Sequence, residues 1–174
     1  MTAADSGGRN VLDALKQGGV DFVASLPDSW FHEVMVALDE EPGIIHVPVT
    51  REEEAVGIAA GAYLAGLRPA VLTQNAGLLN SCNALVTLNQ LYQIPLLLLV
   101  SLRGDLGEAS FYHMPLGRVT VPLLGSLGVQ HWTARTPEDV RLLIPEAMTA
   151  ALAARLPVAV LLTKSAVWGG GGGS

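Results

Sequence analysis

Six short apolar runs that alternate with segments of helical periodicity constrain the fold of this 174-residue chain more than any other feature. The run at 96–102 is apolar at every position before Ser101, which is typical of a strand buried on both faces. Strands that alternate with helices favour a parallel sheet. The sequence therefore predicts an α/β fold with a three-layer, doubly wound, mainly parallel six-stranded sheet. We expect the strands at 21–26, 44–49, 70–73, 96–102, 129–132 and 158–163.

Three helix starts are marked in the sequence. Thr50, followed three residues later by Glu53, matches a capping box, and the helix behind it is expected to run to about residue 64. The segment 27–29 (Pro-Asp-Ser) predicts a turn that caps the next helix. Thr136 followed by Pro137 predicts the start of the last helix, because proline is well tolerated in the first helical turn.

Composition excludes several classes of function. The formal net charge of −6, without a basic patch, indicates no nucleic-acid partner. The single cysteine, Cys82, excludes an internal disulfide and a Cys-rich metal site, and the four histidines lack metal-ligand spacing, so no metal site is expected in this chain. The longest apolar run, 94–100, is too short for a membrane span, which takes about 20 residues. We therefore expect a cytoplasmic protein that makes no membrane contact.

The ends of the chain differ in composition from its middle. We expect a flexible N-terminal segment at 1–8, one folded domain at 9–167, and a glycine-rich tail or linker at 168–174.

Four polar segments follow predicted strands: 27–29, 50–54, 74–80 and 103–113. In doubly wound folds, ligands bind at the carboxyl ends of the strands, so these segments are the candidate site. The glycine fingerprint of dinucleotide-binding folds, the phosphate loop of nucleotide-hydrolysing enzymes and the G-x-S-x-G motif of α/β-hydrolases are all absent from the sequence.

Each candidate residue also has an ordinary structural interpretation. Glu52 is either one of three acids that complement the dipole of a helix or a functional carboxylate. The turn at 74–80 is either a plain strand–helix connection or a cradle of backbone groups for a ligand. His113 is either a solvated loop residue or a proton donor near the substrate.

The segment 51–65 resembles the pyrimidine-binding domain of thiamine-diphosphate enzymes. That family has a glutamate followed by alanine three and seven positions later and glycine nine positions later, and Glu52, Ala55, Ala59 and Gly61 match this spacing. The segment 73–80 (TQNAGLLN) resembles the turn that follows in the family, in the variant found in phosphonopyruvate and sulfopyruvate decarboxylases. The two motifs, in order and at this spacing, identify the resemblance, which covers about 11–163.

The resemblance implies a role for several residues. Glu52 would be the catalytic carboxylate that hydrogen-bonds the pyrimidine nitrogen N1′ of thiamine diphosphate and so activates the cofactor, with His113 as a second catalytic residue. The activated cofactor would attack a 2-oxo acid, which loses CO₂ and leaves as an aldehyde. The implied cofactor contacts are Glu52, Asn75, Gly77 and Asn80. The implied substrate contacts are Ser29, Gln74 and Arg103, with Arg118 as a further cation for a phosphonate or sulfonate group.

The family's G-D-G…N motif, which holds Mg²⁺ and the diphosphate, has no counterpart here, since Gly104-Asp105 is followed by leucine and no asparagine occurs after Asn89. The resemblance is therefore to the alpha subunit of a split decarboxylase that acts on 3-sulfopyruvate or 3-phosphonopyruvate. It implies a beta subunit that binds Mg²⁺ and the diphosphate, within a hetero-oligomer that also associates through two copies of this domain. Two alternatives stay open: a non-catalytic α/β binding or regulatory module, and another thiamine-diphosphate reaction such as carboligation.

Overall fold

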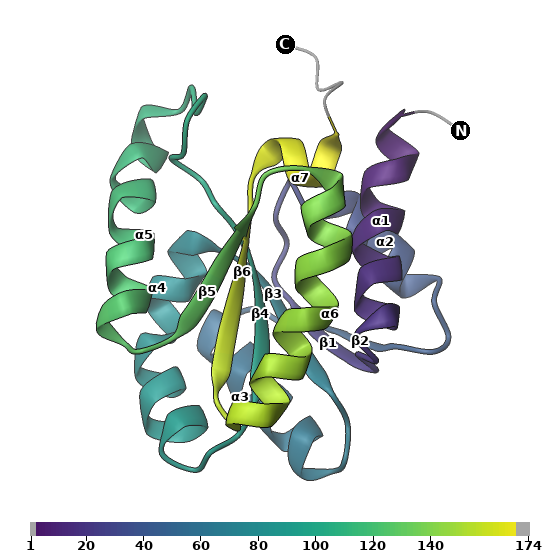
Figure 1. Ribbon diagram of the computed structural model, residues 1–174, viewed down its shortest axis with the longest axis vertical. Coiled ribbons are helices and arrows are strands. Elements are labelled where there is room, and N and C mark those ends of the chain that lie inside the picture. Colours follow the sequence, from purple (N-terminus) through teal and green to yellow (C-terminus); the bar gives the residue numbers. More distant parts are fainter. Residues whose placement is uncertain (1–2, 170–174) are drawn as a thin grey trace.

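The computed structural model describes residues 3–169, and it confirms the predicted α/β fold (Figure 1). Six strands form one sheet in the order β2-β1-β3-β4-β6-β5, with every neighbouring pair parallel. Each predicted strand is present, with ends that differ from the expected ones by at most two residues. The strands are β1 (Phe22–Ser25), β2 (Ile45–Pro48), β3 (Pro69–Gln74), β4 (Leu96–Ser101), β5 (Gln130–Ala134) and β6 (Pro157–Leu162).

Helices cover both faces of the sheet (Figure 1). One face carries α1 (Ala3–Gln17), α2 (His32–Asp39), α6 (Pro137–Ala154) and the short α7 (Lys164–Trp168). The other face carries α3 (Glu52–Leu64), α4 (Asn75–Ala84), its π-helical continuation η1 (Leu85–Gln90) and α5 (Met114–Ser126). A short 3₁₀ turn, η2 (Phe111–His113), lies in the loop between β4 and α5.

Strand β4 supplies the centre of both hydrophobic cores. All six of its residues are buried, which confirms its predicted central position. Because side chains alternate along a strand, Leu97 and Leu99 join the core under α1 and α6, whereas Leu96 and Leu98 join the core under α3 and α5. The edge strands β2 and β5 are only partly buried. Because the inner strands are buried on both faces, their polar side chains gather at the strand ends.

The predicted capping box at Thr50 is wrong. Helix α3 begins one residue later than expected, with Arg51 at the N-cap position and no side-chain cap. This shift makes Glu54 the acid that reaches back, and the backbone N–H and hydroxyl of Thr50 donate to its Oε2 at 3.2 and 3.4 Å. Glu53 instead forms an ion pair with Arg51. The helix start predicted at Thr136 and Pro137 is confirmed, and the structure adds a capping box between Thr136 and Asp139 at the start of α6.

The helix cap predicted at 27–29 is also wrong. Helix α2 begins at His32 with Phe31 as its N-cap and no side-chain cap. Asp28 is drawn instead into an ion pair with Arg103, whose charge would otherwise be buried without a partner.

Three helix boundaries lie outside the expected ranges. Helix α1 begins at Ala3, within the segment expected to be flexible, and the buried Gly7 and Gly8 let it pack closely. Helix α5 begins at Met114, whereas the sequence predicts a helix over 119–127, and Pro115 lies in its first turn. The tail expected at 168–174 lies outside the described residues beyond Gly169, and Trp168 ends the unpredicted helix α7. Among the described residues, no helix is both long and apolar enough to cross a membrane.

The direction of the connections reverses between β1 and β3. The chain runs from β1 outward to β2 on one side, then returns to β3 on the other side. Such a reversal leaves a crevice at the carboxyl ends of the two strands, which is where ligands bind in open α/β sheets. The segments after β1, β3 and β4 are thereby brought to one edge of the sheet.

Alanine substitutions at two glycines should have opposite effects on the free energy of unfolding. Gly61 lies on α3 with nothing within 4 Å of an added Cβ, whereas a Cβ on Gly8 would lie 2.7 Å from the backbone carbon of Glu33. Gly61→Ala should raise the free energy of unfolding by about 0.5–1 kcal/mol because alanine loses less backbone entropy in a helix. Gly8→Ala should lower it, since the backbone of α2 would have to move. Chemical denaturation of both variants tests this, and a destabilised Gly61→Ala would contradict the open surroundings of Gly61.

Candidate functional site

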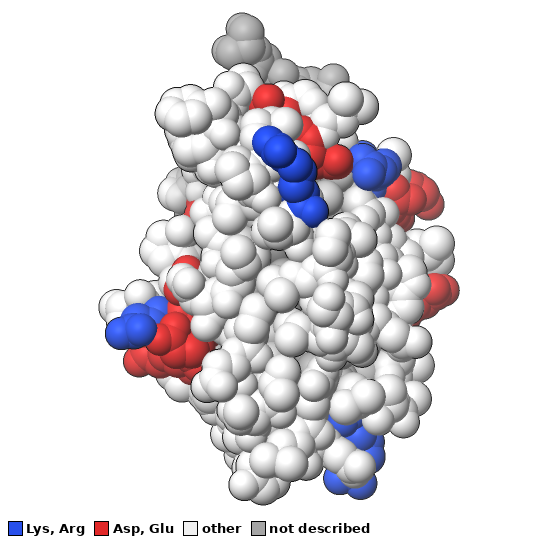
Figure 2. Space-filling view, turned by 90° about the vertical axis from the view of Figure 1, so that its left-hand side faces the viewer, with Lys and Arg blue, Asp and Glu red and all other residues white. Residues whose placement is uncertain are grey.

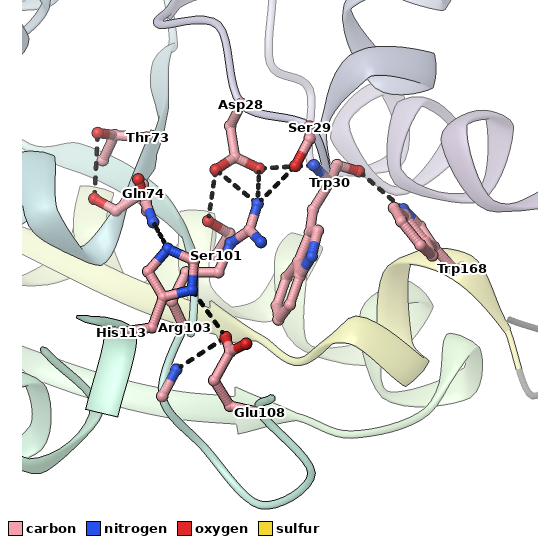
Figure 3. A network of polar contacts seen from close by, with 11 residues as sticks. Asp28, Ser29, Trp30, Thr73, Gln74, Ser101, Arg103, Glu108, His113 and Trp168 are labelled. Carbon is pink, nitrogen blue, oxygen red and sulfur yellow. Dashed lines mark hydrogen bonds and ion pairs between the residues drawn. The ribbon is translucent and has the colours of Figure 1, made fainter. Parts of the chain in front are cut away.

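A polar network joins the carboxyl ends of β1, β3 and β4 (Figure 3). Asp28 and Ser29 come from the segment after β1, and Gln74 ends β3. Arg103 follows β4, and His113 enters from the loop that precedes α5. Four of the predicted site residues, Ser29, Gln74, Arg103 and His113, therefore lie in one network although they are up to 84 positions apart in the sequence.

Arg103 is the buried cation of this network. Its side chain is 10% exposed, and its Nη2 donates to both carboxylate oxygens of Asp28 at 3.0 Å and to the Ser29 hydroxyl at 2.9 Å. Its guanidinium carbon lies 4.0 Å from the centre of the Trp30 ring, a cation–π contact. Ser101 adds a hydrogen bond to Asp28 at 3.3 Å. The pairing offsets the large cost of burying the Arg103 charge.

One hydrogen-bonding group of Arg103 is left open. Its Nε is buried and has no hydrogen-bond partner among residues 3–169. Buried N–H groups are nearly always paired in folded proteins. The unpaired Nε–H is enclosed by protein atoms, so it is not a donor to a ligand, and its burial is an energetic cost to the chain.

His113 is held from both sides of its ring (Figure 3). Its Nδ1 lies 3.0 Å from Oε2 of Glu108, and its Nε2 lies 3.3 Å from the side-chain nitrogen of Gln74. Burial raises the pKa of the Glu108 carboxyl. The hydrogen bonds it accepts from the backbone N–H groups of Ser110 and Gly104 and from His113 outweigh burial, so this pKa is below its ordinary value. A carboxylate therefore faces Nδ1 at neutral pH.

Glu52 lies at the first turn of α3 and faces the start of α4. A Cβ on the buried Gly77 would lie 2.3 Å from Cγ and 2.8 Å from Oε1 of Glu52, and 2.2 Å from the hydroxyl of Thr73. Glycine at position 77 is thus what allows the carboxylate to lie against the first turn of α4. The turn predicted at 74–80 is wrong, because α4 begins at Asn75, directly after β3. Asn80 donates to Oε2 of Glu52 at 3.3 Å, and Oε1 receives no hydrogen bond from residues 3–169.

Asn75 links separate segments of the site through buried hydrogen bonds. Its side chain is fully buried, and its amide nitrogen donates to the carbonyl of Arg103 at 2.8 Å and to the hydroxyl of Thr120 at 3.0 Å. The start of α4 is thereby tied to the segment after β4 and to α5. Its Oδ1 is buried and unpaired within the described part of the chain. A cofactor contact by Asn75 stays a prediction.

A second set of hydrogen-bonded side chains lies at the edge of the sheet and follows the serine–histidine–aspartate order of a hydrolase triad. The Ser25 hydroxyl lies 2.7 Å from Nε2 of His46, and Nδ1 of His46 lies 2.6 Å from Asp39. Ser25 is fully buried, however, so its hydroxyl cannot reach a substrate. These hydrogen bonds link β1, β2 and α2, and we assign them to stability.

Sequence reasoning missed four members of the network: Asp28, Trp30, Ser101 and Glu108. Asp28 was interpreted as part of a helix cap, and only the fold brings it to Arg103. Trp30 and Glu108 carry no local motif. Arg118, considered as a further cation, is exposed on α5 and has no ion pair among the described residues.

Comparison with known proteins identifies relatives that agree with one another in family. The family described as thiamine pyrophosphate enzyme, N-terminal TPP binding domain, matches residues 5–113. The chain is 41% identical to the sulfopyruvate decarboxylase subunit alpha of Methanococcus maripaludis over 87% of this chain and 91% of that protein. It is 43% identical to the subunit of the same name from Methanothermobacter thermautotrophicus, over 89% and 94% of the two chains.

More distant relatives are longer. The chain is 34% identical to the phosphonopyruvate decarboxylase of Streptomyces viridochromogenes over 68% of this chain but only 30% of that protein. A 2-oxoglutarate:ferredoxin oxidoreductase from Magnetococcus marinus matches the fold with a TM-score of 0.72 and 18% identity, over 92% of this chain and 29% of that chain. The latter likeness concerns the fold alone.

The Arg103–Asp28 ion pair predicts that substitutions of the two residues are strongly coupled in their effects on the free energy of unfolding. Arg103→Met leaves the Asp28 carboxylate, whose side chain is 5% exposed, without its cation, and should lower the free energy of unfolding by about 3–5 kcal/mol. Asp28→Asn should also destabilise the chain, and the double variant should cost clearly less than the sum of the two. Urea denaturation of the four proteins measures this. Additive losses would mean that the pair contributes no coupling.

The lowered pKa of Glu108 predicts an acid-sensitive contribution to stability. A carboxyl whose pKa is lower in the folded chain stabilises it fully above the unfolded value of about 4.3 and loses this effect as pH falls through the folded value. The unfolding free energy of the wild type should therefore fall more steeply between about pH 5 and pH 3 than that of Glu108→Gln. Parallel slopes in the two proteins would contradict this prediction.

Proposed function

Because the chain belongs to the family of sulfopyruvate decarboxylase alpha subunits, within the thiamine pyrophosphate enzymes, we propose that it forms one side of an active site that releases CO₂ from a 2-oxo acid to give an aldehyde. We propose 3-sulfopyruvate as the substrate and 3-phosphonopyruvate as the second choice. The alpha subunits are 41–43% identical to this chain, whereas the phosphonopyruvate decarboxylases are 33–34% identical.

The position of Glu52 carries the proposal. Its carboxylate lies over Gly77, is held by Asn80 through Oε2, and has Oε1 open. An open carboxylate oxygen at the lip of a strand-end crevice fits a protonated or hydrogen-bonding ring nitrogen, and a pyrimidine N1′ is such a group. When bound, thiamine diphosphate supplies the electron sink for the electron pair left by CO₂. Glu52 would orient the pyrimidine and hold a proton at N1′. Asn80 and Gly77 would position Glu52 and contact the ring beside it.

The network around Arg103 is proposed to bind the acidic substrate. The Arg103 guanidinium supplies the positive charge, and Ser29 places a hydroxyl beside it. A sulfonate or carboxylate accepts hydrogen bonds from such donors. Gln74 and His113 would lie on the same side of the substrate, with His113 exchanging a proton with it. The Asp28 carboxylate offsets part of the Arg103 charge, so Ser29 and the partner subunit are expected to add to anion binding.

The other side of the site is proposed to belong to a beta subunit that holds Mg²⁺ and the diphosphate. Support comes from the name of the relatives, subunit alpha, and from the longer phosphonopyruvate decarboxylase, of which this chain matches 30%. The surface over α4 and α5 is largely uncharged, with charged residues near its margins (Figure 2). Val86, Val119 and Val121 are exposed on η1 and α5. Such a surface suits burial in a hetero-oligomer that also associates through copies of this domain.

The test is decarboxylation of 3-sulfopyruvate by this chain with thiamine diphosphate and Mg²⁺, with and without a beta subunit that carries the G-D-G…N motif. We expect CO₂ release only when both chains are present. In the complex, Glu52→Gln should lower kcat on the order of 10²-fold or more, because an amide cannot hold the proton at N1′. Glu53→Gln is the matched control. It changes the neighbouring acid, which pairs with Arg51, and should leave the rate unchanged.

Three outcomes of this test distinguish the proposed function from its alternatives. Loss of activity in Glu53→Gln but not in Glu52→Gln would move the catalytic carboxylate by one residue. Formation of a longer, carbon–carbon-coupled product instead of the aldehyde would favour carboligation. No reaction with any 2-oxo acid, together with no binding of thiamine diphosphate by the two-chain complex, would leave a non-catalytic binding module.

A further inference from the structure

We propose that Glu108 is a positioning residue that fixes the ring orientation and tautomer of His113, so that Nε2 of His113 is the nitrogen presented to the substrate. This inference deepens the proposed function and rests on it for the catalytic consequence. The geometry itself stands independently of that function. Glu108 has no sequence motif, and it is identified by its contacts alone.

Glu108 is anchored on both carboxylate oxygens. Oε1 accepts from the backbone N–H of Ser110 at 2.9 Å, and Oε2 accepts from the backbone N–H of Gly104 at 3.4 Å and from the His113 ring at 3.0 Å. Its side chain is 11% exposed and that of His113 is 13% exposed. A surface carboxylate that met a histidine by chance would not be held by two backbone donors of the same loop.

The loop is built so that the two side chains cannot easily separate. Its ends meet at Gly104 and Gly117, where a Cβ on Gly104 would lie 2.2 Å from the carbonyl oxygen of His113, and one on Gly117 would lie 2.1 Å from the carbonyl oxygen of Gly104. Gly104 also has φ +78°, a conformation that favours glycine. Asp105 pairs with Arg135 at 2.8 Å and so ties the loop to the segment after β5. The Glu108–His113 contact is thus fixed within a closed loop.

The hydrogen bonds assign the tautomer. A carboxylate only accepts, so Nδ1 of His113 must carry the proton that faces Glu108. In the neutral ring Nε2 is then an acceptor, which matches the amide N–H of Gln74 directed at it. The ring also meets Tyr112 edge-on, with centroids 4.4 Å apart. On protonation Nε2 becomes a donor, and the Glu108 carboxylate compensates the charge of the imidazolium.

Other charged groups around His113 are already paired. Arg103, from the end of β4, is on the same side of the site in Figure 3 and is bound to Asp28. Asp105, in the same loop, is bound to Arg135. Glu108 is therefore the charged group that contacts the ring directly, since Gln74 is neutral and Tyr112 contributes an aromatic edge.

Replacement of Glu108 by glutamine should reverse the tautomer. The amide keeps the shape of the side chain but replaces one accepting oxygen with an NH₂ group, while three donors, the Ser110 N–H, the Gly104 N–H and Nδ1–H, still require acceptors. The Ser110 N–H makes the shorter of the two backbone contacts, 2.9 Å against 3.4 Å, so we expect it to keep the amide oxygen and to leave the NH₂ group facing Nδ1. The ring then meets the NH₂ group by losing the Nδ1 proton, which places the proton on Nε2. His113 would then present an N–H toward Gln74 in its neutral form.

The first measurement is the tautomer itself. The alpha chain, labelled with ¹⁵N at histidine and bound to its beta subunit without cofactor, gives ring-nitrogen shifts, and His113→Gln identifies the His113 signals among the four histidines. We expect the proton on Nδ1 in the wild type and in Asp105→Asn, and on Nε2 in Glu108→Gln. Asp105→Asn is the matched control, because it loosens the same loop without contact to His113. The same tautomer in wild type and Glu108→Gln would overturn the proposal.

The second measurement is a double-mutant cycle of decarboxylation. Glu108→Gln should lower kcat roughly 10- to 100-fold with little change in KM, within the range of acid–base contributions. In a His113→Gln background, Glu108→Gln should have no further effect, because Glu108 acts through His113. If the two substitutions together lowered kcat by the product of their separate effects, Glu108 would not act through His113, and this part of the proposal would be wrong. If the wild-type complex has no decarboxylase activity, the proposed function fails, whereas the tautomer measurement still decides the role of Glu108.

Discussion

Burial of both faces of the parallel sheet is the constraint on which the rest of this structure depends. Strands β4 and β6 are buried at all their residues, and every residue of β3 before Gln74 is buried as well. No polar side chain can be accommodated along such strands without an internal partner. Functional side chains are thus confined to the strand ends, where the connections leave the sheet. The reversal of connection order between β1 and β3 then selects one crevice at that edge.

The strand ends bring charged and polar groups together, and most of them satisfy one another. Arg103 with Asp28 and His113 with Glu108 are pairs of this kind. The exceptions are informative, because the energetic cost of an unpaired buried polar atom is large. Three buried side-chain atoms lack partners in the described part of the chain: Nε of Arg103 and Oδ1 of Asn75, which lie in or beside the network, and Oδ1 of Asn89, which lies in η1.

Much of the fold and part of the site follow from sequence. The apolar run at 96–102 was sufficient to place a central strand, because five consecutive apolar residues are typical of a strand covered on both faces. Thr136 and Pro137 predicted a helix start correctly, since proline at the first helical position is a local signal. The capping-box rule failed at Thr50, where the helix begins one residue later and Glu54 takes the place expected of Glu53. A run of three adjacent acids contains no local information that distinguishes these registers.

Sequence alone determined the class of fold, the strand-end segments that form the site and, through two motifs, the resemblance to thiamine-diphosphate decarboxylases. Periodicity and spacing are local properties, and they suffice for these conclusions. Tertiary structure decided which side chains meet. Asp28 is 75 positions from Arg103, and Gln74 is 39 positions from His113, so no local pattern could pair them. Glu108 lies only five positions from His113, but a loop has no fixed period, and its closure at Gly104 and Gly117 brings the two side chains into contact. Pairing across the chain depends on strand order and loop closure, which are set by packing of the whole domain.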